Sequence, residues 1–271
     1  MSAPDDALQL CSGLMEIASS AARLAGRYAL EHFKRGVASE RKAGFYDPVT
    51  ECDRQAERLI EELILGAHPD STIVGEEGGQ RGTGAIHWYV DPIDRTNNFI
   101  DRIPFFCVSI GAASGGRLVA GAIYEPVRDE LWAASLNGAS LNGEPITSAG
   151  HSVDSGSVLL TGFPYTGGRA SPADYESFQK LVAAFRAVRR LGSTALELAY
   201  VACGRGDVAF ETNANAWDVA AGMLLVEQAG GRYLAVRSDN QEPWTRPRFV
   251  AACPQFDLER SSLTATRLGR T

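Results

Sequence analysis

The 271-residue sequence predicts an α+β fold followed by an α/β fold. Residues 1–150 contain two amphipathic helical stretches and then a series of short strands with turns between them, whereas residues 151–271 alternate strands with helices. The apolar fraction of 45% is enough for a substantial buried core. We therefore expect two domains, an α+β domain with an antiparallel sheet over residues 1–150 and an α/β domain over residues 151–271.

Helical periodicity marks the first part of the chain. Residues 6–35 place apolar side chains three and four positions apart, which predicts a long amphipathic helix. The polar segment 34–48 contains glycines and a proline and predicts a loop. A second helix is expected after Thr50, because Thr50 and Asp53 have the spacing of a capping box. The positions expected on its buried face are Ala56, Leu59, Ile60, Leu63 and Ile64.

Short apolar runs bounded by turn residues predict the strands. In the first domain they lie at 71–79, 87–94, 105–126 and 129–146, the last two runs containing Gly-Gly and Asn-Gly turns typical of hairpins. In the second domain, strands are expected at 157–163, 187–192, 207–211 and 248–253. Helices are expected there at 193–204 and 216–231.

Composition and charge exclude several classes of protein. The formal net charge is −7, which argues against a nucleic-acid partner and against an anionic membrane surface. The sequence has no run of 18 apolar residues, and its first residues lack the basic segment of a signal peptide, so we expect a cytoplasmic protein. The five cysteines are odd in number and far apart, which predicts free thiols.

Acidic residues stand where predicted strands end and where a predicted helix begins: Glu76, Asp91, Asp94 and Asp218. Each alone fits an ordinary role as a solvated charge, a turn residue or a helix cap. Together they favour a cation site, because carboxylate oxygens suit Mg²⁺ and carboxylates that converge without a cation repel one another. The carbonyl group of Ile93, between the two aspartates, is a further candidate ligand. The four histidines show no ligand spacing.

A site for an anion is expected directly after these aspartates. Thr96 follows Arg95 at the start of a predicted short helix, where free backbone N–H groups bind phosphate. Clustered carboxylates beside such a group indicate metal-assisted phosphoryl transfer.

Three spaced motifs, GEEGG, DPIDRTNNF and WDVAAG, resemble the signatures of the inositol monophosphatase family, and bacterial inositol-1-monophosphatases in particular. The likeness extends to DPVTECD and to VRRLGSTALELAYVACGRGDVAFE, so it covers nearly the whole chain. The resemblance implies a layered α-β-α-β-α sandwich that is often a homodimer. It also implies an Mg²⁺-dependent phosphomonoesterase that acts on a small phosphorylated polyol or sugar and is inhibited by Li⁺.

Matched motif positions imply the roles of single residues. The metal ligands, for two to three Mg²⁺ ions per subunit, would be Glu76, Asp91, the Ile93 carbonyl, Asp94 and Asp218. Thr96 and Asp53 would orient the attacking water, with Glu76 near a third, weaker metal. The residues implied in substrate binding are Lys42, Arg95, Thr96 and Glu211. In this reading a metal-activated water attacks the phosphate in line, and no covalent intermediate forms.

Inositol 1-phosphate is the substrate that the resemblance favours, but alternatives stay open. The metal site would bind only the phosphate, so histidinol phosphate, fructose bisphosphate or a 3′-phosphonucleotide fits equally well. The segments expected to set specificity are TGFPYTGGRASPADY, GSTAL and ETNANA. Arg95 stands where the family has glycine, which leaves a weakly active or non-catalytic binding protein as a further alternative. Its side chain would point to solvent, bind an anion, or pair with the carboxylates and compete with Mg²⁺.

Overall fold

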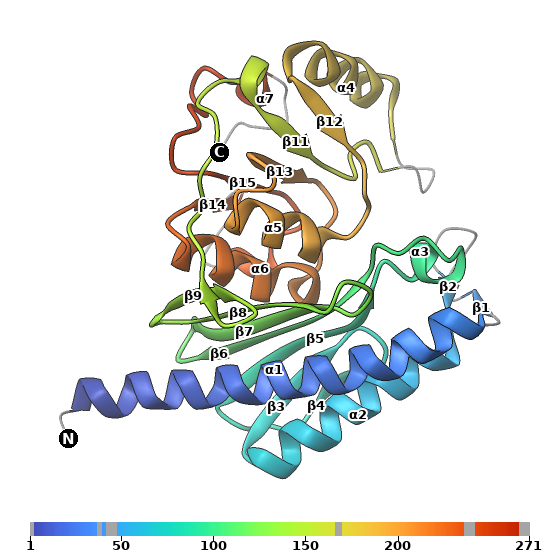
Figure 1. Cartoon of the computed structure of the whole chain (residues 1–271), viewed down its shortest axis with the longest axis vertical. Coiled ribbons are helices and arrows are strands. Elements are labelled where there is room, and N and C mark those ends of the chain that lie inside the picture. The colour runs from blue at the N-terminus through green and yellow to red at the C-terminus, as the bar shows by residue number, and fades with distance from the viewer. Residues whose placement is uncertain (1–2, 37–39, 42–47, 166–169, 236–241, 266–271) are drawn as a thin grey trace.

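The structure, a computed structural model, describes residues 3–36, 40–41, 48–165, 170–235 and 242–265. Helices and sheets alternate in five layers (Figure 1). Two helices cover the outer face of one sheet, two lie between the sheets, and two cover the outer face of the second sheet. In that order they are α1 (Ala3–Arg35), α2 (Glu51–Ala67), α5 (Thr194–Ala202), α6 (Ala216–Gln228), α4 (Pro172–Ala184) and α7 (Ser262–Ala265). The expected α-β-α-β-α sandwich is therefore confirmed.

The first sheet has eight strands in the order β10-β9-β8-β7-β6-β5-β3-β4. All neighbours are antiparallel except β3 and β5, which run parallel. The strands are β3 (Ser71–Gly75), β4 (Gly79–Arg81), β5 (Ile86–Asp94), β6 (Cys107–Ser114), β7 (Arg117–Glu125), β8 (Glu130–Ser135), β9 (Gly138–Leu141) and β10 (Glu144–Pro145). A separate pair, β1 (Glu40–Arg41) and β2 (Pro48–Val49), lies in the segment that we expected to be a loop.

The second sheet has five strands in the order β12-β11-β13-β15-β14. Its bounds are β11 (Val158–Leu160), β12 (Ala187–Arg189), β13 (Val208–Glu211), β14 (Arg232–Ala235) and β15 (Phe249–Ala252). The sheet is mixed, because β15 runs antiparallel to both of its neighbours. The sequence did not predict β14, α4, α7 or two short 3₁₀ turns, η1 (Asp154–Gly156) and η2 (Pro243–Thr245).

Helix α6 lies very close to the first sheet because glycines face it. An added Cβ at Gly111 of β6 would lie 2.6 Å from the Cβ of Ala220, and one at Gly121 of β7 would lie 2.9 Å from the Cα of Ala221. One hydrophobic core therefore contains residues from both halves of the chain. The division into two domains stays a prediction.

The first helix, α1, packs along β6, β7 and α2 through small side chains. Its fully buried positions include Ala18, Ala21 and Ala25, which let the helix approach the sheet closely. Among the described helices, none is both long and apolar enough to cross a membrane. All five cysteines are free.

Candidate active site

A cavity of about 370 Å³ gathers most of the residues that the sequence singled out. Its walls come from the ends of β5 and β13, the starts of α3 (Thr96–Ile100) and α6, and the turn after β3. The predicted site residues that line it are Glu76, Asp91, Ile93, Asp94, Arg95, Thr96, Glu211 and Asp218. Asp53 contacts one of these residues from behind the wall. Lys42 lies outside the described residues.

The end of β5 turns its two aspartates toward the cavity. The antiparallel pairing with β6 is irregular between Asp91 and Asp94, where Pro92 has no N–H to offer to the ladder. The backbone N–H of Ile93 donates a hydrogen bond of 3.0 Å to Oδ1 of Asp91. Asp91 is only 2% exposed and Asp94 6% exposed, so both carboxyls are held in a largely dry environment.

Asp94 is fixed by a segment far along the chain. Its Oδ2 accepts hydrogen bonds of 2.7 Å from the hydroxyl of Ser193 and from the backbone N–H of Ala195, at the start of α5. The sequence also allowed Asp94 to cap the helix that starts at Thr96. That role is not observed, because Arg95 is the N-cap residue of α3 and no side chain caps it.

Asp218 reaches the same cavity from the first turn of α6. It forms a capping box with Asn215, whose backbone N–H lies 2.6 Å from Oδ2 of Asp218. The hydroxyl of Ser109 donates to the carbonyl of Trp217 over 3.1 Å, and Ser109 is the β6 partner of Asp91. This contact holds the start of α6 beside the end of β5.

Glu76 sits in the turn between β3 and β4, and a residue that sequence reasoning missed supports this turn. The carboxylate of Glu57, in α2, accepts hydrogen bonds from the backbone N–H groups of Glu77 (2.9 Å) and Gly78 (2.5 Å). Glu57 is buried, although it lies on a helix whose apolar residues alone were expected to be buried. Its position four residues after Asp53 was the available signal, because i and i+4 share a helix face.

Burial and mutual repulsion disfavour the charged forms of these carboxyls. Burial raises the pKa of Asp91 well above its ordinary value, and the nearby charges of Glu76, Asp94 and Asp218 raise it further. Burial, followed by the charges of Asp94 and Glu76, has the same effect on the pKa of Asp218. A bound cation would relieve this repulsion, so the donor set fits a hard divalent ion.

The chemistry of the donors that line the cavity restricts the kind of ion. Within the described residues, no three His, Cys, Asp or Glu side chains form a ready-made metal cluster. A structural zinc site consists of four protein ligands, mostly Cys and His, that surround the ion. Mg²⁺ keeps several waters and takes only one or two carboxylates directly, so the observed oxygen donors fit Mg²⁺ better.

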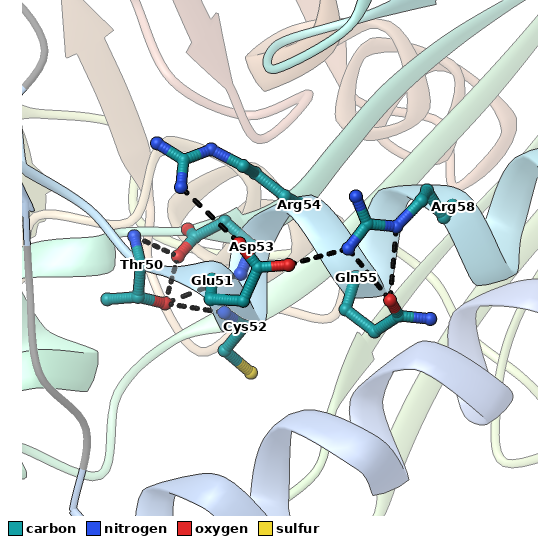
Figure 2. A network of polar contacts seen from close by, with 7 residues as sticks. All are labelled: Thr50, Glu51, Cys52, Asp53, Arg54, Gln55 and Arg58. Atoms are coloured by element: carbon teal, nitrogen blue, oxygen red, sulfur yellow. Dashed lines mark hydrogen bonds and ion pairs between the residues drawn. The ribbon is translucent and has the colours of Figure 1, made fainter.

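Figure 2 shows a polar network at the start of α2, and one of its residues, Asp53, contacts Thr96 of the cavity wall. Thr50 and Asp53 form the expected capping box, in which the backbone N–H of Thr50 donates to Oδ2 of Asp53 over 2.9 Å. The other oxygen, Oδ1, accepts a hydrogen bond of 3.0 Å from the hydroxyl of Thr96. Burial raises the pKa of Asp53, and hydrogen bonds from Thr50 and Thr96 oppose that shift.

Half-buried Glu211 lines another part of the cavity, and fully buried Glu197 lies behind it. Glu211 ends β13 and accepts a hydrogen bond from the backbone N–H of Gly162. Burial raises its pKa to about 7. Sequence reasoning missed its neighbour Glu197, which is 0% exposed in α5 and whose pKa is raised well above the ordinary value, first by burial and then by the charge of Glu211. A single acid inside the apolar run LELAYV was the available signal.

Arg95 adopts a left-handed backbone conformation, with φ 79° and ψ 59°. Glycine adopts this conformation without strain, whereas other residues do so at a cost of about 1 kcal/mol or more. Its side chain lies against Gly192, since an added Cβ there would lie 2.5 Å from Nε of Arg95. Burial raises the pKa of Asp94, and hydrogen bonds from Ser193 and Ala195 and then the charge of Arg95 oppose that shift.

The three segments expected to set specificity all contribute to the cavity wall. They supply Gly162, Tyr165, Gly192, Thr194, Asn213 and Asn215. A further wall residue, Arg190, was not singled out from the sequence. The pair of successive arginines in VRRLG was a weak signal, because charged residues are mostly found on surfaces.

Comparisons with known proteins identify the family and support the fold. The profile of the inositol monophosphatase family matches residues 12–268. Nus factor SuhB of Pseudomonas aeruginosa is 41% identical over 226 residues, which are 80% of this chain and 83% of that protein. The crystal structure of the extragenic suppressor protein suhB from Bartonella henselae has a TM-score of 0.82 and 33% identity, covering 89% of this chain and 94% of that one. Inositol monophosphatase from Anabaena (Nostoc) sp. has a TM-score of 0.78 and 35% identity, with coverage of 89% and 91%.

These relatives correct one expectation. From the net charge of −7 we expected no nucleic-acid partner, and that expectation is wrong, because several relatives at about 40% identity are named Nus factor SuhB. Net charge is a sum over the whole chain and describes neither a local surface nor contacts made within an assembly. The motifs, the five-layer fold and the family match agree with one another, and the chain belongs to the inositol monophosphatase family.

Proposed function

We propose that the protein is an Mg²⁺-dependent phosphomonoesterase that hydrolyses the phosphate ester of a small polyol. One observation carries the proposal. Four carboxylates, from β5, α6 and the turn after β3, line the same cavity as Thr96, whose hydroxyl donates a hydrogen bond to Asp53. Inositol 1-phosphate is the reference substrate. Inhibition by Li⁺ is an expectation that follows from the family.

The carboxylates are the groups that would hold the metal. Asp91, Asp94 and Asp218, with the carbonyl of Ile93, would bind two Mg²⁺ ions, and Glu76 would contribute to these or to a third, weaker ion. When bound, Mg²⁺ supplies Lewis-acid chemistry that polarises the phosphoryl oxygens and makes a water molecule more acidic. Ser193 and Ala195 both donate to Oδ2 of Asp94, which leaves the other oxygen, Oδ1, for a cation.

Thr96 and Asp53 would orient the attacking water. A threonine hydroxyl has one proton and two lone pairs, and the proton of Thr96 is donated to Asp53. A lone pair can then accept a hydrogen bond from a water molecule, which would direct the water oxygen toward the phosphorus atom. The raised pKa of Asp53 makes its carboxylate a better proton acceptor during the attack.

Glu211 would bind substrate hydroxyl groups. Its carboxylate faces the cavity at the end of β13 and is held by the Gly162 N–H. The proposal is tested with inositol 1-phosphate, histidinol phosphate, fructose 1,6-bisphosphate, a 3′-phosphonucleotide and p-nitrophenyl phosphate, each with and without Mg²⁺. Glu211→Ala should weaken turnover of polyol phosphates about tenfold or more, and turnover of p-nitrophenyl phosphate much less. Equal losses would contradict the assigned role, and the absence of Mg²⁺-dependent turnover would contradict the function.

The names of the relatives support a second candidate function, that of a Nus factor. This role requires a binding surface and no turnover. We expect the chain to complement a Pseudomonas aeruginosa strain that lacks its SuhB. The variant Asp94→Asn, which should lack turnover, separates the two functions: complementation by this variant would show that the second function does not depend on catalysis.

A further inference from the structure

Two arginines line the cavity in addition to its carboxylates. Arg95 lies at the start of α3 and Arg190 follows β12. In the part of the chain that the structure describes, neither guanidinium forms an ion pair within 4.0 Å of a carboxylate. Positive groups that face a cavity without a carboxylate partner are suited to bind an anion from outside.

Arg190 is held in place by neutral groups. One of its terminal nitrogens donates hydrogen bonds of 2.9 Å to the carbonyls of Gly162 and Pro164. Its guanidinium also lies over the ring of Phe178, 5.7 Å from the ring centroid. These contacts orient the guanidinium without neutralising it, and a guanidinium has five N–H donors, so others remain for a ligand.

Arg95 lies against the backbone of Gly192, which is two residues after Arg190. Its Nε lies so close to Gly192 that any side chain at position 192 would displace it. Arg95 is exposed to solvent, but this contact holds the base of its guanidinium at the wall of the cavity. It also does not pair with a described carboxylate, so it does not compete with Mg²⁺ in that way.

The position of Arg95 places its charge near the polyol part of the proposed site. Burial raises the pKa of both Glu211 and Glu197, and the positive charge of Arg95 is one of the smaller effects that oppose these shifts. Both arginines line the same cavity, so a ligand bound there lies within the field of both positive charges. The carboxylates, in contrast, bind phosphate only through a cation.

We propose that Arg95 and Arg190 form a subsite for a second anionic group, a phosphate or a carboxylate, on the substrate. This inference rests on the proposed phosphatase function and narrows its substrate class. Among small polyol phosphates, esters with a second anionic group should be preferred to inositol 1-phosphate. Arg95 is then a specificity-determining residue, and the replacement of the family glycine adds a ligand contact.

The test measures binding with ligands that a phosphatase does not cleave. Butylphosphonate and butane-1,4-bisphosphonate differ in one anionic group. Both have a C–P bond in place of the C–O–P ester, so a phosphatase does not hydrolyse them. Calorimetric titration at saturating Mg²⁺ should show that the bisphosphonate binds about tenfold or more tightly than the monophosphonate. Arg95→Asn and Arg190→Gln should each remove most of this preference while leaving monophosphonate binding within about twofold. Asparagine is chosen at position 95 because it tolerates the left-handed conformation.

Arg102→Asn is the matched control. Arg102 also has a positive φ, of 59°, but it lies outside the cavity and donates to the carbonyl of Lys34. The Arg102→Asn variant should keep the full preference for the bisphosphonate over the monophosphonate. Equal binding of both phosphonates by the unsubstituted protein would overturn the inference, as would equal losses for both ligands in Arg95→Asn, which would place Arg95 on the transferred phosphate.

Turnover of p-nitrophenyl phosphate, measured on the same preparations, tests the proposed function separately. An inactive protein that still prefers the bisphosphonate in an Arg95-dependent way would support the subsite and contradict the phosphatase assignment. An active protein without that preference would contradict the subsite alone.

Discussion

The hydroxyl of Thr96 donates a hydrogen bond of 3.0 Å to Oδ1 of Asp53, a residue 43 positions earlier in the chain. Asp53 is also the third residue of α2 and the partner of Thr50 in its capping box, so one carboxylate stabilises a helix and orients a hydroxyl at the cavity. The two roles make different demands, and substitutions separate them.

Thr96→Val removes the hydroxyl and keeps the shape of the side chain. We expect turnover to fall about 10²-fold or more, because the attacking water loses its orienting group. Unfolding by urea should show a change of only about 1 kcal/mol. Thr72→Val is the control, since the Thr72 hydroxyl is also buried and donates to the carbonyl of Gly84, away from the cavity. A similar loss of turnover in both variants would contradict the role of Thr96.

Asp94→Asn removes one negative charge from the carboxylate cluster. We expect most of the turnover to be lost while the protein stays folded, because the amide oxygen of the new side chain would still accept a hydrogen bond from Ser193 or Ala195. The unsubstituted protein should gain thermal stability with rising Mg²⁺, since a ligand that binds only the folded state stabilises it, and the variant should gain much less. Asp207→Asn, which alters a buried carboxylate bonded to the N–H groups of His151 and Val158, should keep the full Mg²⁺ response.

The pKa of Glu211 predicts how stability depends on pH without Mg²⁺. Burial raises this pKa from 4.5 in the unfolded chain to about 7, so the folded state binds the proton more tightly. Its contribution is complete below pH 4.5 and is lost as the pH rises from about 4.5 to about 7. Relative to Glu211→Gln, the unsubstituted protein should therefore lose stability across this window, as measured by urea unfolding in the presence of EDTA.

Glu130→Gln serves as the control for this pH profile. A hydrogen bond from Arg205 lowers the pKa of Glu130, so its titration lies below the window. The stability difference between this variant and the unsubstituted protein should stay constant between pH 5 and pH 8. Parallel profiles for all three proteins would show that Glu211 does not titrate as its burial implies.

The left-handed conformation of Arg95 predicts an unusual order of stability. The free energy of unfolding, measured with urea, should be about 1 kcal/mol higher for Arg95→Gly than for Arg95→Ala. Alanine keeps the strain at a φ of 79°, and glycine removes it. At Arg58, inside α2, the order should be reversed, since glycine weakens a helix by about 1 kcal/mol relative to alanine. Equal stabilities of the two Arg95 variants would mean that the position relaxes after substitution.

Local sequence patterns were sufficient to predict the elements that local interactions define. The capping box of Thr50 and Asp53 has a fixed spacing, and the start of α2 follows from it. The strand that ends at Asp94 was visible as an apolar run before a proline. Helix α4 was missed although Ser171 and Asp174 form a capping box there, because glycines and prolines, which are typical of turns and loops, precede it and stand at its start.

Contacts between distant segments could not be predicted in the same way. Nothing near Asp94 in the sequence indicates that Ser193 and Ala195 bind its carboxylate, because only the packing of α5 against the first sheet brings them together. The burial of Glu197 also depends on that packing. The functional roles of the cavity residues stay predictions, since they depend on a ligand rather than on the fold.

Helix α2 supports two parts of the site at once. Asp53 contacts Thr96, and Glu57, one turn later on the same face, holds the turn that carries Glu76. A residue inserted between them would rotate the second half of the helix by about 100° and shift it by about 1.5 Å. One of the two contacts would then be lost whichever half kept its place. The spacing of Asp53 and Glu57 is therefore a length constraint, and α2 should tolerate exchange of its solvent-facing side chains far better than any insertion or deletion in its first two turns.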